Sequence, residues 1–555
     1  MNAAHGCPTL KFCLAFACAF LGVATAPAGR HESFTAKFAT GPKMIPQAAT
    51  FFGGNSADEF VEACVLPDGV IVAFGNSAGP AFPESPKPVI LGRGKHQGLD
   101  PLPASGKEGP LFSRENPDLA GMIVRFSPDL RAVIGVTRFD WGVASFSTGV
   151  VSRDGKALLV AGRCTAAFRG LGPMVKVLDV PQADEAPAPG RKAPATPVRG
   201  PYRYGNVTAP GDVFVARMTP DGSRIEWAWV LPGFRNPPGQ MWSDRQGALY
   251  VSANGMWRIS AEGGKPERIN PVMDGRTAQY HLVDPGDGAQ YFGGDRNTNT
   301  GYQPYRQPYL YKYDAKGTKL WKMWEPNPKS VACGGPGNGL CSDSSVRAME
   351  WASNGDLLVA GWSDGGNSVF GRQPNDMGRA AGPGAMGMSA WGMKNANSLA
   401  YVLRIDPKTA EQTAWTLWLS FLPDNFVDSK SRGAPNFASI RGVKGLVDNS
   451  IAIVGSAATG LPQTPGALFG APADGSKYGG QFVAVLTPAM DNAMYSSYLP
   501  GIEEAGIAPG KTGLLVFGRA GAPSETGTAN LTLHPVQAAR RGVTDAWIAW
   551  VAPAR

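Results

Sequence analysis

The chain has 555 residues, including 72 glycines and 48 prolines, and 17% of its residues are charged. Its 52 Lys and Arg outnumber its 44 Asp and Glu, which gives a net charge of +8. With 43% hydrophobic residues the composition excludes a disordered chain, and so much glycine and proline excludes a helical bundle. It is typical of many short strands joined by turns.

The first 28 residues are predicted to be a signal peptide. Lys11 precedes the apolar stretch Phe12 to Ala26, which is too short to span a bilayer comfortably and ends in small residues. Cleavage after Ala28 would leave residues 29–45 as an N-terminal extension and residues 46–555 as the folded domain. We therefore expect an exported protein, located in the periplasm, at the cell surface or outside the cell. Lipid anchoring at Cys18 is the less favoured alternative.

A degraded repeat runs from about residue 50 to the end of the chain. One half reads as a strand, a turn of the Pro-Asp-Gly kind and a strand that ends in glycine, as in VEACVLPDGVIVAFG at 61–75. The other half is a pair of strands such as DVFVARMTPDGSRIEWAWVLPG at 212–233. Because one small sheet cannot bury its own faces, copies of it must stack on each other. The repeat therefore predicts a radial all-β architecture.

Counting the units gives the expected number of sheets. The second strand of each unit ends near Gly75, Gly162, Ala253, Gly293, Gly361, Gly455 and Gly518. This predicts a single seven-bladed β-propeller. Asp545–Val551 resembles a third strand without a fourth, and Gln47–Phe52 resembles a fourth strand without a third. We expect these two to pair, which would close the ring and remove two exposed edges.

Long insertions follow the second strand of most units, at 76–120, 163–211, 295–307, 363–397, 456–480 and 519–543. In an up-and-down blade this connection always emerges on the same face, so one face is expected to carry a crown of loops. Such a crown is either a binding surface or tolerated surface growth, since long insertions cost little free energy. The sequence leaves both interpretations open.

The second insertion is rich in basic residues. These candidate ligand-binding residues are Arg163, Arg169, Lys176, Arg191, Lys192, Arg199 and Arg203. A basic surface on an exported protein favours an extracellular macromolecule as partner, such as an acidic glycan or a cell-surface protein. Nucleic acid is not expected, because the chain has no recognised nucleic-acid-binding module.

Four cysteines remain after the signal peptide. Cys333 and Cys341 bracket a glycine-rich loop, CGGPGNGLC, and export favours their oxidation to a disulfide. Cys64 and Cys164 lie in or next to predicted strands and are expected to be free thiols.

Motifs for metal binding or catalysis are sparse. The four histidines of the mature chain are scattered, and each is expected to be a surface or hydrogen-bonded residue. Asp295, Asn297 and Asn299 alternate as calcium ligands do, although the following glycine comes one position late and no acidic residue closes the loop. An ordinary Asx-rich turn is the alternative to a calcium site there.

Two enzyme hypotheses remain as alternatives. Glu62, Asp244 and Glu350 lie near predicted inner strands, where carboxylates of propeller carbohydrate hydrolases and lyases converge. The aromatic-rich unit Tyr309–Trp324 looks like the tryptophan-containing blades of quinoprotein-type dehydrogenases. Tryptophans at strand ends also commonly pack between blades, so the second hypothesis is the more remote.

Several motifs together resemble the secreted bacterial β-propeller proteins that carry SBBP-type repeats. They are Phe52-Gly53-Gly54 after a fourth strand, the Val-Ala-Gly strand ends, the run GLPQTPGALF at 460–469 and DAWIA from Asp545. The resemblance implies the propeller fold and export, but no single activity. The chain is accordingly predicted to be an exported, non-catalytic binding or surface scaffold.

Overall fold

The fold was analysed in a computed structural model. It describes residues 44–54, 57–78, 86–92, 119–140, 142–179, 212–232, 238–253, 256–269, 280–284, 286–297, 306–324, 343–363, 372–382, 384, 399–418, 438–458, 461–465, 467, 480–521, 531–541 and 544–554. These residues are almost entirely β-structure; their single helix is α3 (Ala166–Arg169). The all-β prediction is confirmed.

The strands of the described residues form seven sheets of four or five strands and one two-stranded sheet. In chain order the first three large sheets contain β2 (Asp58–Val65), β3 (Ile71–Ser77), β5 (Ala120–Phe126), β6 (Val133–Phe139) and β4 (Val89–Leu91); β7 (Ala144–Val151), β8 (Leu158–Cys164), β10 (Asp212–Met218), β11 (Ile225–Leu231) and β9 (Val175–Val177); and β12 (Met241–Ser243), β13 (Leu249–Ser252), β14 (Met256–Ile259) and β15 (Glu267–Ile269).

The next four large sheets contain β16 (Tyr280–Val283), β17 (Gln290–Asn297), β18 (Arg306–Tyr313) and β19 (Lys319–Met323); β20 (Ser344–Trp351), β21 (Leu357–Ser363), β24 (Leu399–Ile405) and β25 (Gln412–Trp418); β26 (Ala438–Gly445), β27 (Ile451–Ala457), β28 (Gly480–Leu486) and β29 (Ala493–Tyr498); and β30 (Ile502–Gly510), β31 (Gly513–Ala520), β32 (Asp545–Pro553) and β1 (Met44–Phe52). The small sheet contains β22 (Arg372–Gln373) and β23 (Asp376–Ala380).

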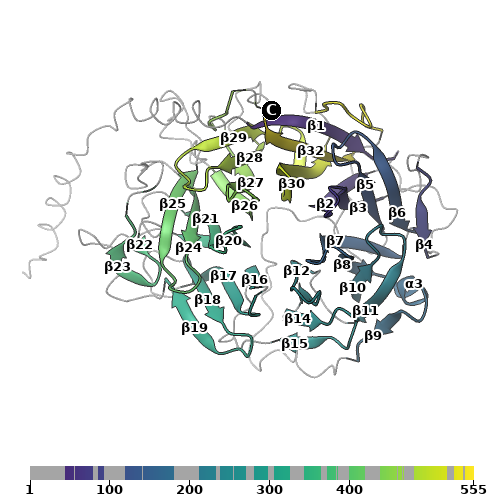
Figure 1. The fold of residues 1–555 in the computed structure, drawn as a ribbon, viewed down its shortest axis with the longest axis horizontal. Coiled ribbons are helices and arrows are strands. Elements are labelled where there is room, and N and C mark those ends of the chain that lie inside the picture. The colour runs from purple at the N-terminus through teal and green to yellow at the C-terminus, as the bar shows by residue number, and fades with distance from the viewer. Residues whose placement is uncertain are drawn as a thin grey trace, which may run out of the picture.

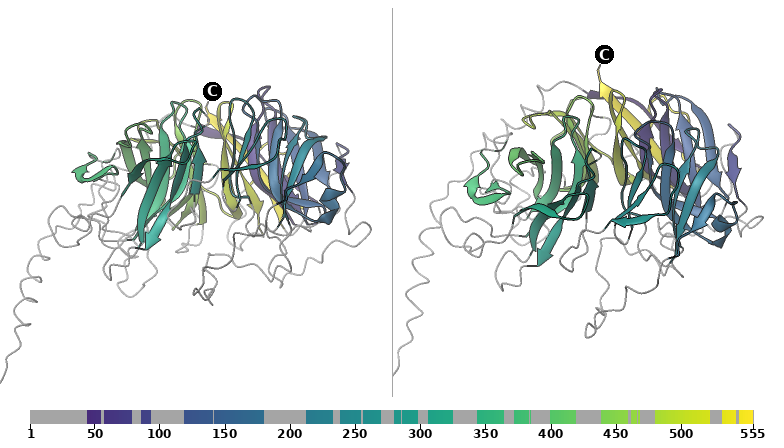
Figure 2. Two further views of the ribbon diagram at one scale, coloured as in Figure 1. Left: turned by 90° about the horizontal axis from the view of Figure 1, so that it is seen from below. Right: turned by 60° about the horizontal axis from the view of Figure 1, so that its bottom comes forward.

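The large sheets are arranged around a common centre in the manner of a β-propeller (Figure 1). The first strand of each large sheet is nearest the middle (Figure 1). The fourth strand is outermost in the four-stranded sheets, and β4 and β9 lie outside it in the two five-stranded sheets. Seen from the side, the strands run across the thickness of the molecule (Figure 2). Up-and-down pairing of consecutive strands explains this arrangement, because each large sheet except the one that contains β1 is built from one stretch of chain.

The two ends of the chain meet in one sheet, as predicted. β1 pairs antiparallel with β32, and the register runs from Met44 opposite Pro553 to Phe52 opposite Ala546. The third strand of this sheet therefore comes from the C-terminus and the fourth from the N-terminal region. We call the β1–β32 pair, with the residues at its Phe52–Ala546 end, the seam.

The glycine that ends the second strand has a structural cause. In the five sheets that begin with β2, β7, β20, β26 and β30, the first strand has a register shift opposite the end of the second strand. In the sheet of β7, a Cβ on Gly162 would overlap the carbonyl oxygen of Ser145. The equivalent glycines Gly75, Gly361 and Gly455 face carbonyl oxygens in the same way. The repeated glycine therefore lets two backbones approach at a β-bulge.

Parts of the insertions cover the outer edges of the sheets. β4 pairs parallel with the outer strand β6, and β9 pairs parallel with the outer strand β11. The β22–β23 hairpin binds β25 through two hydrogen bonds between Gln373 and Gln412, of 2.9 and 3.1 Å. Thr464 N–H donates to Ser496 of β29 at 3.1 Å, and Leu533 exchanges two backbone hydrogen bonds with Ala49 of β1. A covered edge cannot recruit a strand from another molecule.

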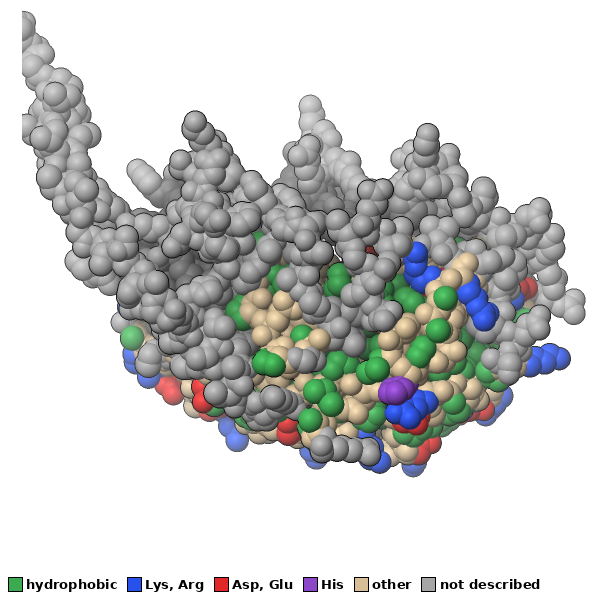
Figure 3. Space-filling model, turned by 90° about the horizontal axis from the view of Figure 1, so that it is seen from above, with side chains coloured by type: hydrophobic (Ala, Val, Ile, Leu, Met, Phe, Trp, Pro, Cys, Tyr) green, Lys and Arg blue, Asp and Glu red, His purple; other side chains and the backbone are tan. Residues whose placement is uncertain are grey.

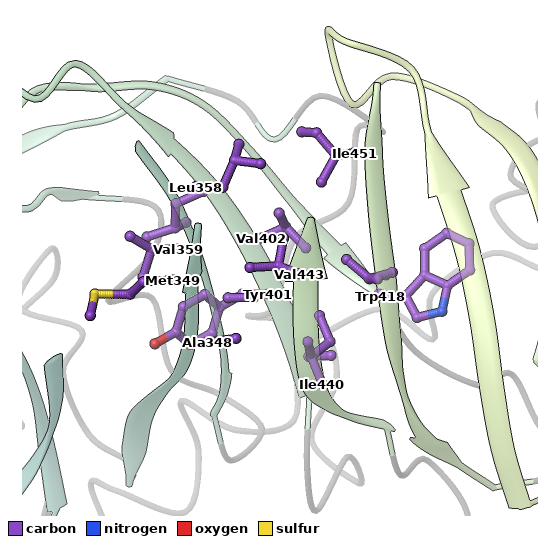
Figure 4. Packing of buried hydrophobic residues seen from close by; sticks show 14 of the residues in the cluster. Ala348, Met349, Leu358, Val359, Tyr401, Val402, Trp418, Ile440, Val443 and Ile451 are labelled. Atoms are coloured by element: carbon purple, nitrogen blue, oxygen red, sulfur yellow. The ribbon is translucent and has the colours of Figure 1, made fainter. Parts of the chain in front are cut away.

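Neighbouring sheets are held together by an apolar core and by polar clamps. Figure 4 shows the packing between the sheets of β20 and β26, where Met349, Tyr401 and Val443 are buried. At the turns, the buried guanidinium of Arg404 bonds Asp356 at 3.0 Å in its own sheet and the carbonyl of Asn449 at 3.1 Å in the next. This interface therefore combines burial of apolar side chains with oriented hydrogen bonds.

Candidate functional site: the charged inner strands

Charged side chains of three inner strands gather around Lys444 of β26. Its ammonium donates to the Glu350 carboxylate of β20 at 2.7 Å. Glu62 of β2 acts on the same ammonium electrostatically. We call Glu62, Glu350 and Lys444 the inner-strand cluster. Two of the three carboxylates singled out in the sequence therefore share one cation.

The cluster keeps Lys444 protonated. Partial burial lowers the pKa of Lys444, but the carboxylates of Glu350 and Glu62 outweigh this effect, so the pKa lies above its usual value. A lysine acts as a nucleophile or base only when its amine is neutral at the working pH. Lys444 is therefore suited to holding an anion or a carboxylate, and not to covalent catalysis.

Asp244 is held apart from this cluster by the turn that follows β12. Its carboxylate accepts hydrogen bonds from the backbone N–H groups of Gln246 and Ala248, at 3.0 and 2.8 Å. It also lies 4.0 Å from the Arg258 guanidinium. These contacts fix the turn between β12 and β13. The structure therefore gives Asp244 a structural role.

A second set of charges lies on β26 and β30. Arg441 donates to the Glu504 carboxylate and to the side-chain oxygen of Gln481, both at 2.7 Å. Arg441 is skipped by the β26–β27 pairing at the bulge, which turns its side chain away from the regular alternation. On β20, Arg347 occupies the equivalent bulge position and lies over the Trp362 ring, 5.7 Å from its centre. Bulges therefore place arginines at one end of two adjacent inner strands.

Lys444 and Arg441 are not predicted as site residues from the sequence, although the repeat contains the signal. Aligned on their bulges, the inner strands place Cys64, Glu350 and Lys444 at the same position, three residues after the bulge. Glu62 lies two residues before Cys64, on the same side of its strand. An alignment of the repeats by bulge would have placed these charges on one inner surface.

Three of the seven predicted basic residues lie in the described part of the chain. Arg163 is buried within β8 and is 1% exposed. Arg169, in the last turn of α3, forms an ion pair with Asp212. Lys176 of β9 donates to the Gly263 carbonyl at 3.2 Å and lies over the Trp229 ring. Arg191, Lys192, Arg199 and Arg203 lie outside the described residues, so ligand binding by the set stays a prediction.

On the face drawn in Figure 3, the charges of the described side chains are mixed. Figure 3 shows acidic and basic side chains interspersed along the lower edge of the described atoms in that view. Interspersed signs produce a weak long-range field, which favours solubility over steering of a charged partner.

The predicted calcium loop begins within a strand. Asp295 and Asn297 belong to β17, which pairs with β18 through Asn297, and Asn299 lies outside the described residues. No group of three His, Cys, Asp or Glu suited to a metal ion occurs in the described residues. Calcium binding there stays a prediction.

The described cysteines are free thiols, as predicted. Cys164 is buried and Cys64 is partly exposed, and burial raises the pKa of both thiols. The predicted disulfide between Cys333 and Cys341 lies outside the described residues, as do the signal peptide and the Cys18 anchor site. No helix in the described ranges has the length and apolar character needed to cross a bilayer.

The aromatic unit Tyr309–Trp324 packs into the molecule. Trp321 donates its indole N–H to the Pro407 carbonyl at 3.2 Å, and Lys312 donates to the same carbonyl at 3.0 Å. Trp324 is fully buried. These contacts join β18 and β19 to the β24–β25 turn of the next sheet. They assign these side chains to inter-sheet packing.

His281 is a half-buried, hydrogen-bonded histidine. Its Nδ1 lies 3.0 Å from the Ser252 hydroxyl, and its ring packs edge-on against Phe292. Burial lowers the pKa of His281 to about 4, so the ring is neutral at neutral pH. The expectation of a hydrogen-bonded residue is confirmed for this histidine.

The radial arrangement of the sheets defines the class of protein, an all-β fold of the β-propeller type. Similar solved structures include Sqt1 from Chaetomium thermophilum, at 8% identity over 92% of this chain and 100% of that chain with a TM-score of 0.37. Sqt1 from Saccharomyces cerevisiae matches at 7% identity over 92% and 100%, with a TM-score of 0.35. Hydrazine synthase from Kuenenia stuttgartiensis matches at 10% identity over 64% and 79%, with a TM-score of 0.32.

The sequence comparisons give no family assignment. No protein-family model matches the chain, and no curated protein matches it. The resemblance to SBBP-type repeats therefore stays a prediction, and the fold rests on the strand pairing described above.

Proposed function

We propose that this chain is an exported, non-catalytic binding scaffold, built as one seven-bladed propeller that the β1–β32 pair closes. Its partner would be an extracellular macromolecule, such as an acidic glycan or a cell-surface protein, bound through the loop-rich face. One observation carries the proposal. The repeated residues maintain the pairing of the strands in each sheet, through bulges and close backbone approaches. The length and sequence of the chain vary mainly in the connections between the second and third strands. A constant frame with variable connections is the usual design of a binding scaffold.

The charges of the described inner strands support a non-catalytic function. Lys444 and Glu350 neutralise each other, Arg441 is paired with Glu504, and Asp244 holds a turn. Groups that satisfy one another in this way stabilise the frame and present a polar surface. Binding to the loop-rich face would leave them undisturbed.

The test compares binding by the mature protein with binding by a variant in which residues 185–207 are replaced by a Gly-Ser turn. This change removes Arg191, Lys192, Arg199 and Arg203 but leaves α3, β9 and β10 in place. Binding to an array of acidic and neutral glycans and to whole cells should be lost in the variant. A matched control shortens residues 523–529, which contain no Lys or Arg, and should bind as the unaltered protein does. Unchanged binding by both folded variants would refute the proposed surface.

A carbohydrate-active enzyme remains the second candidate, and the inner-strand cluster is the observation in its favour. Glu62 and Glu350 converge on Lys444, and paired carboxylates are the machinery of glycoside hydrolysis. Turnover of a sugar polymer that is abolished by Glu350→Gln, with glycan binding retained, would establish this function. A Lys444→Met control would separate loss of the ion pair from loss of an acid or base. Turnover unaffected by Glu350→Gln would exclude this site.

A further inference from the structure

Two carboxylates meet in the buried interior of the seam. Asp58 begins β2 and Asp545 begins β32, and both are 0% exposed. Both pack against Gly53, the residue after β1: a Cβ there would lie 2.6 Å from Asp58 Oδ2 and 3.1 Å from Asp545 Cγ. Placing two carboxylates in one small buried volume is costly when both are ionised.

Hydrogen bonds leave one oxygen of Asp58 without a partner. Its Oδ2 accepts the Gly54 N–H at 2.9 Å, and the Ser77 side chain also interacts with the carboxyl group, while Oδ1 is buried and meets no hydrogen-bond criterion with any described residue. Asp545 Oδ2 accepts from the Gln537 side-chain amide at 2.6 Å and from the Arg541 N–H at 3.0 Å. The donors to Asp545 favour its ionised form, and Asp58 Oδ1 is the atom left for a proton.

The charged side chains on the surrounding elements have identifiable contacts. Glu59 on β2 accepts a hydrogen bond from Asn76 on β3, and Arg519 on β31 pairs with Glu503 on β30. Arg540, before β32, donates to the Gly521 carbonyl at 2.7 Å, and the neighbouring Arg541 contributes its backbone N–H to Asp545. None of the ion pairs among the described residues includes Asp58.

We propose that Asp58 is a proton-operated latch of the seam. In the closed form its carboxyl is protonated on Oδ1, so that only Asp545 of the two carboxyl groups carries a negative charge. Loss of the proton to solvent leaves two buried negative charges beside Gly53, and their repulsion weakens the junction between the first and last strands. The latch is independent of what the loop-rich face binds.

The direction of the pH effect follows from linkage. Burial raises the pKa of Asp58 to about 7, with Asp545 adding to the rise and hydrogen bonds from Ser77 and Gly54 opposing it. An unfolded aspartate ionises near 3.8. Between these values the folded chain holds a proton that the unfolded chain does not, so stability falls as pH rises from about 4 to about 7 and then levels off.

The test is thermal unfolding of the full-length chain between pH 5 and pH 8. The melting temperature of the unaltered protein should fall over this range, and Asp58→Asn, which is neutral at every pH, should lose most of the fall. Glu59→Gln is the matched control, because this neighbouring buried acid already has a donor in Asn76. It should keep the fall. A flat profile for the unaltered protein, or an unchanged fall in Asp58→Asn, overturns the proposal.

If Asp58→Asn does not fold, the proposal can be tested by amide hydrogen exchange of the unaltered protein. After correction for intrinsic rates, the opening constant of β32 amides should rise by up to about tenfold per pH unit between about pH 5 and 7, as expected for loss of one proton. β24 amides in a distant sheet that exchange by local opening should not share this rise. Equal rises in both strands, or recovery of seam protection at pH 8 on adding Ca²⁺, would overturn the proton latch, the latter in favour of a cation.

Discussion

Five of the large sheets differ from the other two in both their inner and their outer strands. The five have a bulge in the first strand, and insertion residues cover their fourth strand. The sheets of β12–β15 and β16–β19 have short first strands with regular register, and no described segment pairs with the outer edge of β15 or β19. In these two sheets the connection between the second and third strands is also shorter than in the other five.

The composition of the outer strands follows the same division. Covered strands are largely uncharged, as in QTAWTLW of β25 and AMYSSY of β29. The strands without a described cover read ERI in β15 and KLWKM in β19. Charge on an edge strand and a covering segment are two ways to prevent strand addition by another molecule. The comparison therefore indicates that part of each long insertion protects its own sheet.

Of the changes that test this comparison, removal of β32 should destabilise the protein most. Truncation after residue 541 removes β32, the strand between β1 and β31, together with its buried Trp547 and Ile548. Two strand edges, and the apolar side chains that packed against those two residues, are then exposed. We expect loss of cooperative thermal unfolding and aggregation in size-exclusion chromatography. Removal of the last residue alone, Arg555, is the control and should leave both unchanged.

Replacing the glycine at the end of the second strand by alanine should destabilise a sheet with a bulge more than a sheet without one. Gly162→Ala places a methyl group against the Ser145 carbonyl at a bulge, and we expect a loss of about 3 kcal/mol in unfolding free energy. In β17, Gly293→Ala meets the Val346 and Met349 side chains at 3.0 and 3.1 Å, which can shift, so less than about 1 kcal/mol is expected. Chemical denaturation measures both. Equal losses would contradict the assigned role of the bulge.

Loss of an edge cover should be milder. Gln373→Ala removes two hydrogen bonds to Gln412 and leaves buried polar groups of β25 without partners. We expect a loss of about 1–3 kcal/mol, measured by denaturant titration. Asn375→Ala, on the same hairpin but at an exposed hydrogen bond to Thr409, should cost less than about 0.5 kcal/mol.

Removal of charge from β19 should affect association more than stability. In a variant with Lys319→Leu and Lys322→Leu, the unfolding free energy is expected to change by less than about 1 kcal/mol. Because the edge would lose its repulsive charges, light scattering should detect concentration-dependent self-association. Lys316→Leu, in the adjacent turn, is the control. A strictly monomeric double variant would show that β19 is protected by other means.

Much of the frame could be predicted because strand signals are local. The second strands ending near Gly75, Gly162 and Gly361, and the pairing of the terminal strands, follow from turn residues and from counting strands in each unit. The charged cluster could not be predicted in this way. Glu62, Glu350 and Lys444 are far apart in the chain, and their meeting depends on how three sheets pack. Arg163 shows the opposite error, since it was counted with an exposed loop and lies buried in β8.

The all-β class, the position of the long connections and the partner of each terminal strand can all be inferred from the amino-acid sequence. Those properties depend on hydrophobic alternation and turn chemistry within a few residues. Tertiary structure alone decided that Val175–Val177 covers β11, that Lys444 lies between carboxylates and that Asp58 faces Asp545. In each case the energy comes from desolvation and from contacts between distant segments, and both exist only after the sheets have packed.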